Sequence, residues 1–428
     1  MLDRSWSVLS FRDQPNPQHV EYANPSAIEP SLTQIRRAAP LVFAGRVDQL
    51  RDELAAAQTG DGFLVQAGDC AERFVDSEAG AVHRRLDTVR AVAGALAERS
   101  GQRVILAARM AGQYAKPRSN PWEVRDGVRL PSYFGDLYND VAFSAEARRP
   151  DARRMLLGYQ CAARTLCAAL ALHDACEPWQ HRIARPDPVE GTAGALTWYT
   201  SHEGLNLDYE AAQTRRVAGY RGHYDLSGHL PWIGDRTRSP GGAHVEFFRG
   251  VRNPIGVKLG AAARGDELAE LLGALNPGNE PGRLVLVTRL GVSRVEAVLP
   301  ELVRGVERAR ARVLWVCDPM HGNTRHLASG YKTRRVADVL GELEATFAVH
   351  DRLGTRLGGV HLEVTGDDVT ECVGLPTCRS EHEVGLDYRS ACDPRLSGAQ
   401  SRLVARRVAD WLRASRSSGA VAVNAAGG

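Results

Sequence analysis

The side chains best suited to chemistry are a thiol, an imidazole and two carboxylates that lie far apart along the chain. Cys70, His321 and Glu363 stand at or just beyond the ends of short apolar runs, and Asp393 lies in a loop after the last run. One soft, one intermediate and two hard donors suit a divalent transition metal such as Mn, Co, Fe or Zn better than Mg or Ca. These four residues are therefore candidate metal ligands.

A second set of candidates consists of cations that follow the same kind of apolar run. An enclosed cluster of this charge calls for anionic ligands, and phosphate and carboxylate groups match the forked donors of arginine. The set comprises Arg109, Lys116, Arg118, Arg236, Lys258 and Arg289.

Structural roles are the alternative for each of these residues. A cysteine at a strand end is usually a small buried residue, and a single histidine is more often a satisfied structural group. Surface cations are usually solvated or paired, and Glu363 and Asp393 could be helix caps or ion-pair partners. Only their joint placement at successive strand ends favours a site, and the pattern alone leaves both interpretations open.

The elements that must position these residues alternate between short strands and helices. Eight apolar runs followed mostly by helical patterns predict a (β/α)8 TIM barrel, an α/β fold in which the strand ends converge on one mouth. A doubly wound open sheet is the structural alternative. The predicted strands are Phe63–Gln66, Val104–Ala107, Ala195–Tyr199, Leu230–Ile233, Ile255–Lys258, Leu284–Val287, Val313–Val316 and Val360–Val364.

The predicted helices are Arg46–Ala57, Ala79–Glu98, Ala152–Ala175, Tyr209–Val217, Glu267–Leu275, Ser293–Ala309, Arg334–Asp351 and Ser397–Ala414. We expect residues 1–58 to form an N-terminal extension with an irregular arm and a helix. Residues 59–414 would form the barrel, and the Ser- and Gly-rich residues 415–428 a disordered tail.

Composition excludes several classes of function. The 428 residues carry 54 basic and 51 acidic side chains, a formal charge of +3, which gives no support to binding of nucleic acid or of a membrane surface. The sequence has no apolar run long enough to span a membrane and no signal-like start. Eight cysteines in a chain of this length form no disulfide framework, so a cytoplasmic location is expected.

Longer motifs around the candidate residues resemble one known family, the type II (plant-like) 3-deoxy-D-arabino-heptulosonate 7-phosphate (DAHP) synthases. The resemblance extends from about Leu41 to Leu412. The matching stretches include Gln66–Glu72, Gly112–Ser119, Ser201–Leu205, Trp232–Arg238, Arg252–Lys258, Cys317–Thr324, Gly330–Arg334, His361–Glu363, Thr365–Cys372 and Cys392–Leu396.

The resemblance implies condensation of phosphoenolpyruvate with erythrose 4-phosphate to DAHP and phosphate, the first step of the shikimate pathway. It implies a metal, Mn²⁺ in the first place and Co²⁺ or Zn²⁺ as alternatives, and a homo-oligomer of two or more chains. The residues it assigns are a metal site of Cys70, His321, Glu363 and Asp393, phosphoenolpyruvate contacts from Arg109, Asp235, Arg236, Lys258 and Arg289, erythrose 4-phosphate contacts from Lys116, Arg118 and Ser119, and catalytic roles for Lys258, Arg236 and His321.

The same comparison changes the interpretation of the stretch around His321. Cys317 and Asp318 also end the predicted strand there, but the family pattern selects His321 as the ligand. Cys317 is then expected to be a buried strand residue, and Asp318 to orient the histidine or the backbone.

Departures from the family pattern suggest further hypotheses. Asp235 replaces a usual Glu, Phe134 replaces a usual Arg, and the chain between Arg109 and Asp235 is short, without the helices that form aromatic effector sites. We therefore expect a short-form enzyme that is insensitive to Trp, Phe and Tyr and serves secondary metabolism. An amino or imino analogue of erythrose 4-phosphate is an alternative acceptor, and a non-catalytic regulatory paralogue is a further alternative. A further hypothesis is that Cys70 and Cys392 form a reversible disulfide that switches the metal site off.

Overall fold

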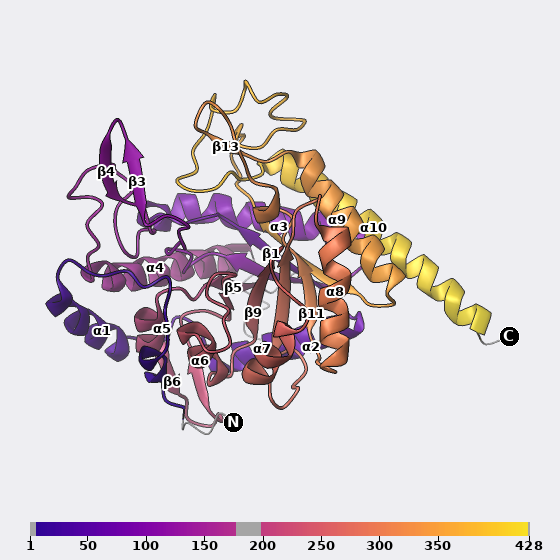
Figure 1. Ribbon diagram of the computed structural model, residues 1–428, viewed down its shortest axis with the longest axis horizontal. Coiled ribbons are helices and arrows are strands. Elements are labelled where there is room, and N and C mark those ends of the chain that lie inside the picture. Colours follow the sequence, from indigo (N-terminus) through magenta and orange to yellow (C-terminus); the bar gives the residue numbers. More distant parts are fainter. Residues whose placement is uncertain (1–5, 177–197, 427–428) are drawn as a thin grey trace.

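Eight parallel strands close into a barrel in the computed structural model, which describes residues 6–176 and 198–426 (Figure 1). The order around the barrel is β1-β14-β11-β10-β9-β8-β5-β2, so the predicted TIM barrel is confirmed and the open sheet is wrong. The strands are β1 (Phe63–Gly68), β2 (Val104–Arg109), β5 (Trp198–Glu203), β8 (Leu230–Ile233), β9 (Ile255–Gly260), β10 (Leu284–Arg289), β11 (Leu314–Cys317) and β14 (Leu357–Glu363).

Several strands extend further than their apolar runs. Residues 195–197 of the predicted third strand lie outside the described residues, while β5 continues to Glu203. Strands β2 and β10 continue to Arg109 and Arg289. Backbone pairing between parallel strands does not depend on side-chain polarity, so the ladder continues until polar side chains reach the mouth of the barrel.

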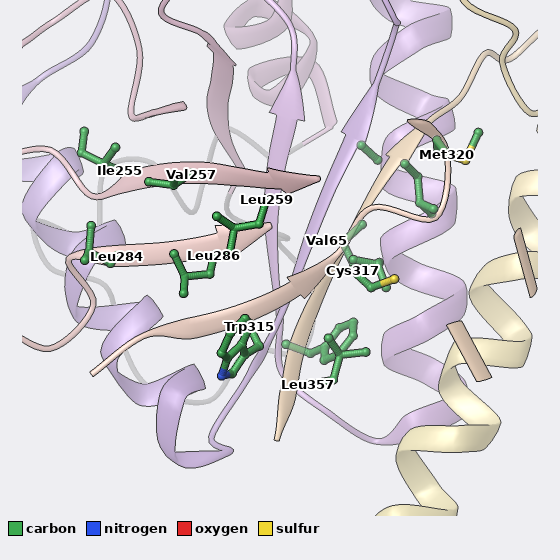
Figure 2. Packing of buried hydrophobic residues seen from close by; sticks show 14 of the residues in the cluster. Val65, Ile255, Val257, Leu259, Leu284, Leu286, Trp315, Cys317, Met320 and Leu357 are labelled. Atoms are coloured by element: carbon green, nitrogen blue, oxygen red, sulfur yellow. The ribbon is translucent and has the colours of Figure 1, made fainter. Parts of the chain in front are cut away.

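Alternation along each strand separates two apolar layers. Ile255, Val257 and Leu259 of β9 point outward toward the helices, as do Trp315 and Cys317 of β11 (Figure 2). Cys317 is therefore a buried strand residue, as expected. The opposite faces form an inner cluster that includes side chains such as Leu64, Val285 and Val316.

The inner cluster is completed by a helix that precedes the first strand. Helix α2 (Ala44–Thr59) contributes Leu50, Leu54 and Ala57 to it. These residues lie on one face because their spacing follows the helical period. The amino-terminal end of the barrel is thus filled with side chains, and the polar strand ends lie at the opposite end.

The remaining helices surround the barrel (Figure 1). The predicted helix Tyr209–Val217 is wrong in its second half, because α5 ends at Gln213 and Thr214–Arg216 forms strand β6, paired with β7 (His223–Asp225). Helix α10 continues past residue 415, the expected boundary between the barrel and the tail. The disorder expected for residues 415–428 stays a prediction. The helices are α1 (Ile28–Arg37), α3 (Ala79–Ser100), α4 (Arg153–Cys176), α5 (Leu207–Gln213), α6 (Ala243–Arg249), α7 (Glu267–Leu275), α8 (Val295–Arg308), α9 (Val336–Arg352) and α10 (Gly398–Ala426).

Two further short antiparallel hairpins lie outside the barrel sheet. The hairpins β3 (Trp122–Arg125) with β4 (Val128–Pro131), and β12 (Arg325–His326) with β13 (Lys332–Thr333), were not predicted. Within the described residues, no helix combines the length and the apolar character needed to cross a membrane.

Candidate active site

A cavity of about 410 Å³ opens among the carboxyl ends of the barrel strands. Most of the site residues predicted from the sequence line it, and the other three, Cys70, Arg109 and Glu363, are buried. Strand ends spread over more than 250 residues of chain are brought together because the barrel is closed. The predicted residues that line the cavity are Lys116, Arg118, Ser119, Asp235, Arg236, Lys258, Arg289, His321 and Asp393.

Three of the four predicted metal ligands face one another. Donor atoms of His321, Glu363 and Asp393 all lie within 4.8 Å of one another, and His321 Nε2 lies 3.1 Å from Glu363 Oε1. The thiol of the fourth, Cys70, is next to this group, with its Sγ 3.3 Å from the backbone N of Asp393. One imidazole, two carboxylates and an adjacent thiol fit a divalent transition metal.

Asp318 fixes the orientation of the histidine. Its carboxylate lies 2.7 Å from His321 Nδ1 and accepts a hydrogen bond from the backbone N of His321. A hydrogen bond at Nδ1 leaves Nε2 directed at Glu363, the arrangement that metal-binding histidines require. Burial opposes ionisation of Asp318, but His321 and Lys258 outweigh it and hold its pKa well below the usual range. Asp318 is thus an orienting group, as expected.

Glu363 is fully buried and surrounded by cations. Arg109 donates to Oε1 at 3.0 Å, Arg334 donates to Oε2 at 2.8 Å, and Lys116 Nζ lies 3.6 Å from Oε1. Burial alone would raise its pKa, but His321, Lys116 and the two arginines hold the pKa well below the usual range. The carboxylate is therefore ionised and available as a ligand.

Lys258 is a buried amine of the cavity. It donates to Asp318 Oδ2 at 2.8 Å and lies 3.2 Å from Nε2 of the buried His361. Burial lowers the pKa of Lys258 to about 8, although Asp318 opposes the shift. Arg109 also contacts His361, at 2.5 Å, so the two cations are held side by side.

Asp235, the residue that departs from the family pattern, is engaged by its own neighbours. Its Oδ1 accepts hydrogen bonds from the backbone N of Gly260 at 2.8 Å and from Arg238 at 3.1 Å, and its Oδ2 lies 3.7 Å from Arg289. The Asp235 carboxylate therefore lies at the end of β9, where it contacts Gly260, and it also lies close to Arg289.

The loop carrying the predicted acceptor contacts is held by the N-terminal arm. Gln18 Oε1 accepts a hydrogen bond from the backbone N of Arg118 at 2.9 Å, and Arg236 donates to Ser119 Oγ at 2.5 Å. Lys116 points deeper, toward the two carboxylates of the metal group, with its Nζ 3.7 Å from Asp393. Phe134 packs against Tyr138, so the position of the missing arginine is filled by an aromatic contact.

The lysines of the chain have an unusual distribution. The sequence contains only three, Lys116, Lys258 and Lys332, among 54 basic residues. All three line the cavity, and Lys332 donates to Asp393 at 2.9 Å. Arginine serves at every other basic position, so the compact ammonium group occurs only at this site.

Comparison with known proteins identifies the family of this chain. The model of the class-II DAHP synthetase family matches residues 6–185 and 188–409. The chain belongs to the class-II DAHP synthetase family. A phospho-2-dehydro-3-deoxyheptonate aldolase of Streptomyces coelicolor is 40% identical over 94% of this chain and 97% of its own length. Proteins of the same name from Neurospora crassa and Mycolicibacterium smegmatis are 36% and 38% identical, over 96% and 91% of this chain.

For a class-II DAHP synthetase, the cavity also contains residues outside the predicted site set, among them Lys332 and Glu203. Glu203 ends β5 and is buried, and its Oε1 has no hydrogen-bond partner in the described part of the structure. Its backbone N–H donates a hydrogen bond to Gln113 Oε1 at 2.9 Å. The predicted strand ends at Tyr199, whereas β5 continues to Glu203. Glu203 lies within the matching stretch Ser201–Leu205, and extending the predicted strand into that stretch would have placed it at the mouth of the barrel.

Buried glutamates also hold the loops that carry site residues of this family member. Glu72 accepts backbone N–H groups from the loop after β2, and Glu371 accepts those of Arg389, Ser390 and Arg395 around Asp393. Glu342 acts similarly beside β10 and β11. A carboxylate that satisfies several buried amides fixes a loop at one position.

The thiols Cys70 and Cys392 meet in a small buried cluster with Tyr133. Both are free, and burial raises the pKa of the Cys70 thiol. We expect oxidation of the metal-free protein to prevent its activation by added metal, and a dithiol reductant to restore that activation, because a bridge would remove the donor sulfur. Activity and free-thiol content measured together test this; a Cys392→Ser variant that loses activity to the oxidant just as readily would contradict it.

Proposed function

We propose that this chain condenses phosphoenolpyruvate with erythrose 4-phosphate to form DAHP and inorganic phosphate. The observation that supports it most is a single cavity in which a His-Glu-Asp donor group adjoins a set of buried and half-buried cations. A divalent metal held by Cys70, His321, Glu363 and Asp393 would supply a Lewis acid for the aldehyde oxygen of erythrose 4-phosphate.

The cations would hold the first substrate. Arg109, Arg236, Lys258 and Arg289 would bind the phosphate and carboxylate of phosphoenolpyruvate and orient carbon 3 toward the aldehyde. Carbon 3 attacks the carbonyl carbon, and positive character develops at carbon 2 of phosphoenolpyruvate. Lys116, Arg118 and Ser119 would bind erythrose 4-phosphate beside it.

Water must then add to carbon 2 before phosphate departs. Glu203 is suited to orient that water, because among the described residues its buried Oε1 has no hydrogen-bond partner, and it lines the same cavity as Arg236, Lys258 and Arg289. We expect Glu203→Gln to lower kcat by about 10²-fold with little change in the KM for phosphoenolpyruvate, the size of effect typical of a lost general base. Steady-state kinetics would check this, and an unchanged kcat would exclude Glu203 from the water step.

The decisive assay follows phosphate release by the purified full-length chain. Release should require phosphoenolpyruvate, erythrose 4-phosphate and a divalent metal together, with Mn²⁺, Co²⁺ and Zn²⁺ compared after chelation. An amino analogue of erythrose 4-phosphate is the competing acceptor, and its kcat/KM is measured in parallel. Binding of both substrates without turnover would instead favour the non-catalytic paralogue.

The same phosphate-release assay, with aromatic amino acids added, examines feedback regulation. We propose a short-form homo-oligomer that is insensitive to aromatic amino acids and supplies secondary metabolism. Between Arg109 and Asp235 the described residues comprise the hairpin β3–β4, helices α4 and α5, strand β5, the β6–β7 pair and β8. Inhibition by physiological Trp, Phe or Tyr would contradict this proposal.

A further inference from the structure

Two loops at the mouth of the barrel pack backbone against backbone. Gly291 follows β10 and Gly322 follows β11. A Cβ atom placed on Gly322 would lie 2.3 Å from the backbone N of Gly291, and one placed on Gly291, at φ 84°, would lie 2.8 Å from the carbonyl O of Gly322. No side chain fits between these loops, so a displacement of one is transmitted to the other.

A carboxylate from helix α9 binds both loops from behind. Glu342 is fully buried, and its Oε1 accepts the backbone N–H groups of Leu290 at 2.8 Å and Gly291 at 2.9 Å. Its Oε2 accepts a hydrogen bond from Asn323 Nδ2 at 2.7 Å. One oxygen therefore holds the loop after β10, and the other holds the loop after β11.

Asn323 completes the link between the loops. Its Oδ1 accepts the backbone N–H of Val292 at 2.9 Å, and its Nδ2 also donates to the carbonyl O of Pro319 at 2.8 Å. The Asn323 side chain thus links two segments. It contacts Pro319 in the turn that contains His321, and Val292 in the loop after β10. Every polar atom of the Asn323 amide is used.

The two loops carry residues of different binding sites. Arg289, at the end of β10, is the proposed anion contact, and His321 is the proposed metal ligand. Arg289 Nη2 donates to the carbonyl O of His321 at 3.3 Å, so the two residues touch directly. An anion that orients Arg289 therefore acts on the segment that presents the imidazole.

We propose that Glu342 is a positioning residue through which the metal site and the phosphoenolpyruvate site strengthen each other. This rests on the proposed function, which assigns Arg289 and His321 their ligands. Phosphoenolpyruvate bound by Arg289 fixes the loop after β10, and the metal bound by His321 fixes the loop after β11. Through the Glu342–Asn323 link, fixing either loop restricts the motion of the other. The coupling is reciprocal by thermodynamic necessity: metal tightens phosphoenolpyruvate binding by the same factor as phosphoenolpyruvate tightens metal binding.

Equilibrium titrations of the full-length chain test the coupling. The Kd of Mn²⁺ is measured with and without phosphoenolpyruvate, and the Kd of phosphoenolpyruvate with and without Mn²⁺. The wild type should show a ratio of at least about fivefold in both directions. Because burial raises the pKa of Glu342 to about 7, the titrations are made about one unit or more above that pH.

The informative variant is Glu342→Gln. Its amide oxygen still accepts from Leu290 and Gly291, while its NH₂ group opposes the donor of Asn323 and breaks the link to the His321 loop. Each ligand alone should bind within about twofold of wild type, and the coupling ratio should fall toward one. The double variant E342Q/N323D restores a donor–acceptor pair and should recover part of the ratio, which a general loss of stability would not do.

Controls separate this inference from the proposed function. Glu344→Gln removes the same charge from an exposed position two residues along α9 and should leave the ratio unchanged. A wild-type ratio of one, or a ratio that survives in folded Glu342→Gln, overturns the inference while the proposed function stands. Failure of the wild type to bind either ligand overturns the proposed function. If Glu342→Gln does not fold, Asn323→Ala breaks the same link and should give the same loss.

Discussion

Replacing Glu363 with glutamine is expected to abolish tight metal binding and to lower the free energy of unfolding of the metal-free protein by about 3–5 kcal/mol. The carboxylate is the shared partner of Arg109 and Arg334, which are 1% and 0% exposed. A neutral amide leaves both guanidinium groups buried without their counter-charge, and it removes one ligand from the donor group.

The stability deficit should depend on pH with a defined sign. The pKa of Glu363 in the folded chain lies well below its ordinary value of 4.5. A depressed pKa contributes stability in full above the unfolded value and loses it as the pH falls through the folded value. Denaturant unfolding should therefore show the full deficit at neutral pH and a smaller one below about pH 4.5.

Glu381→Gln is the matched control for this variant. Glu381 also pairs with two arginines, Arg325 at 3.0 Å and Arg335 at 2.7 Å, but all three side chains are exposed. Water screens the charges of solvent-exposed pairs, so little change in the free energy of unfolding is expected. Isothermal titration with Mn²⁺ supplies the second measurement, and wild-type affinity in Glu363→Gln would refute its assignment as a ligand.

Lys258→Met is expected to lower kcat/KM for phosphoenolpyruvate by about 10²–10³-fold, the effect typical of losing one preorganised group that faces developing charge. The amine is 7% exposed and is the hydrogen-bond partner of Asp318, which in turn orients His321. Its loss removes a cation from the substrate site and leaves the Asp318 carboxylate with one cationic neighbour fewer.

Two further variants help to interpret the kcat/KM of Lys258→Met. Lys258→Arg keeps the charge but cannot reproduce the compact ammonium contact, so it should recover only part of the activity. Arg264→Met removes an exposed cation from the loop after the same strand, 72% exposed, and should behave as wild type. Near-normal kcat/KM in a folded Lys258→Met enzyme would remove Lys258 from the substrate site.

The barrel could be predicted from the sequence because each strand is an apolar run bounded by polar residues and helical periods. The same pattern predicts that the candidate metal ligands and cations lie at or just beyond strand ends. The β6–β7 and β3–β4 hairpins were missed because their strands are only three or four residues long, and short paired strands have no apolar period of their own.

Partner choice within the site could not be predicted in the same way. Nothing in the spacing of Lys116 indicates that its amine would lie against Glu363 and Asp393, more than 240 residues away. Glu342 was expected only as part of a helix, since a buried acceptor for two loop amides is defined by loops from other parts of the chain. Such roles depend on how loops close, which side-chain periodicity does not encode.

The confinement of all three lysines to one cavity gives the protein an unusual chemical selectivity. Reagents that form imines with primary amines find side-chain targets only at Lys116, Lys258 and Lys332. An aldehyde that also carries a phosphate group would be drawn to the same place by the neighbouring arginines. Covalent labelling followed by borohydride reduction would therefore mark the cavity, and the substrates would protect it, without any engineered handle.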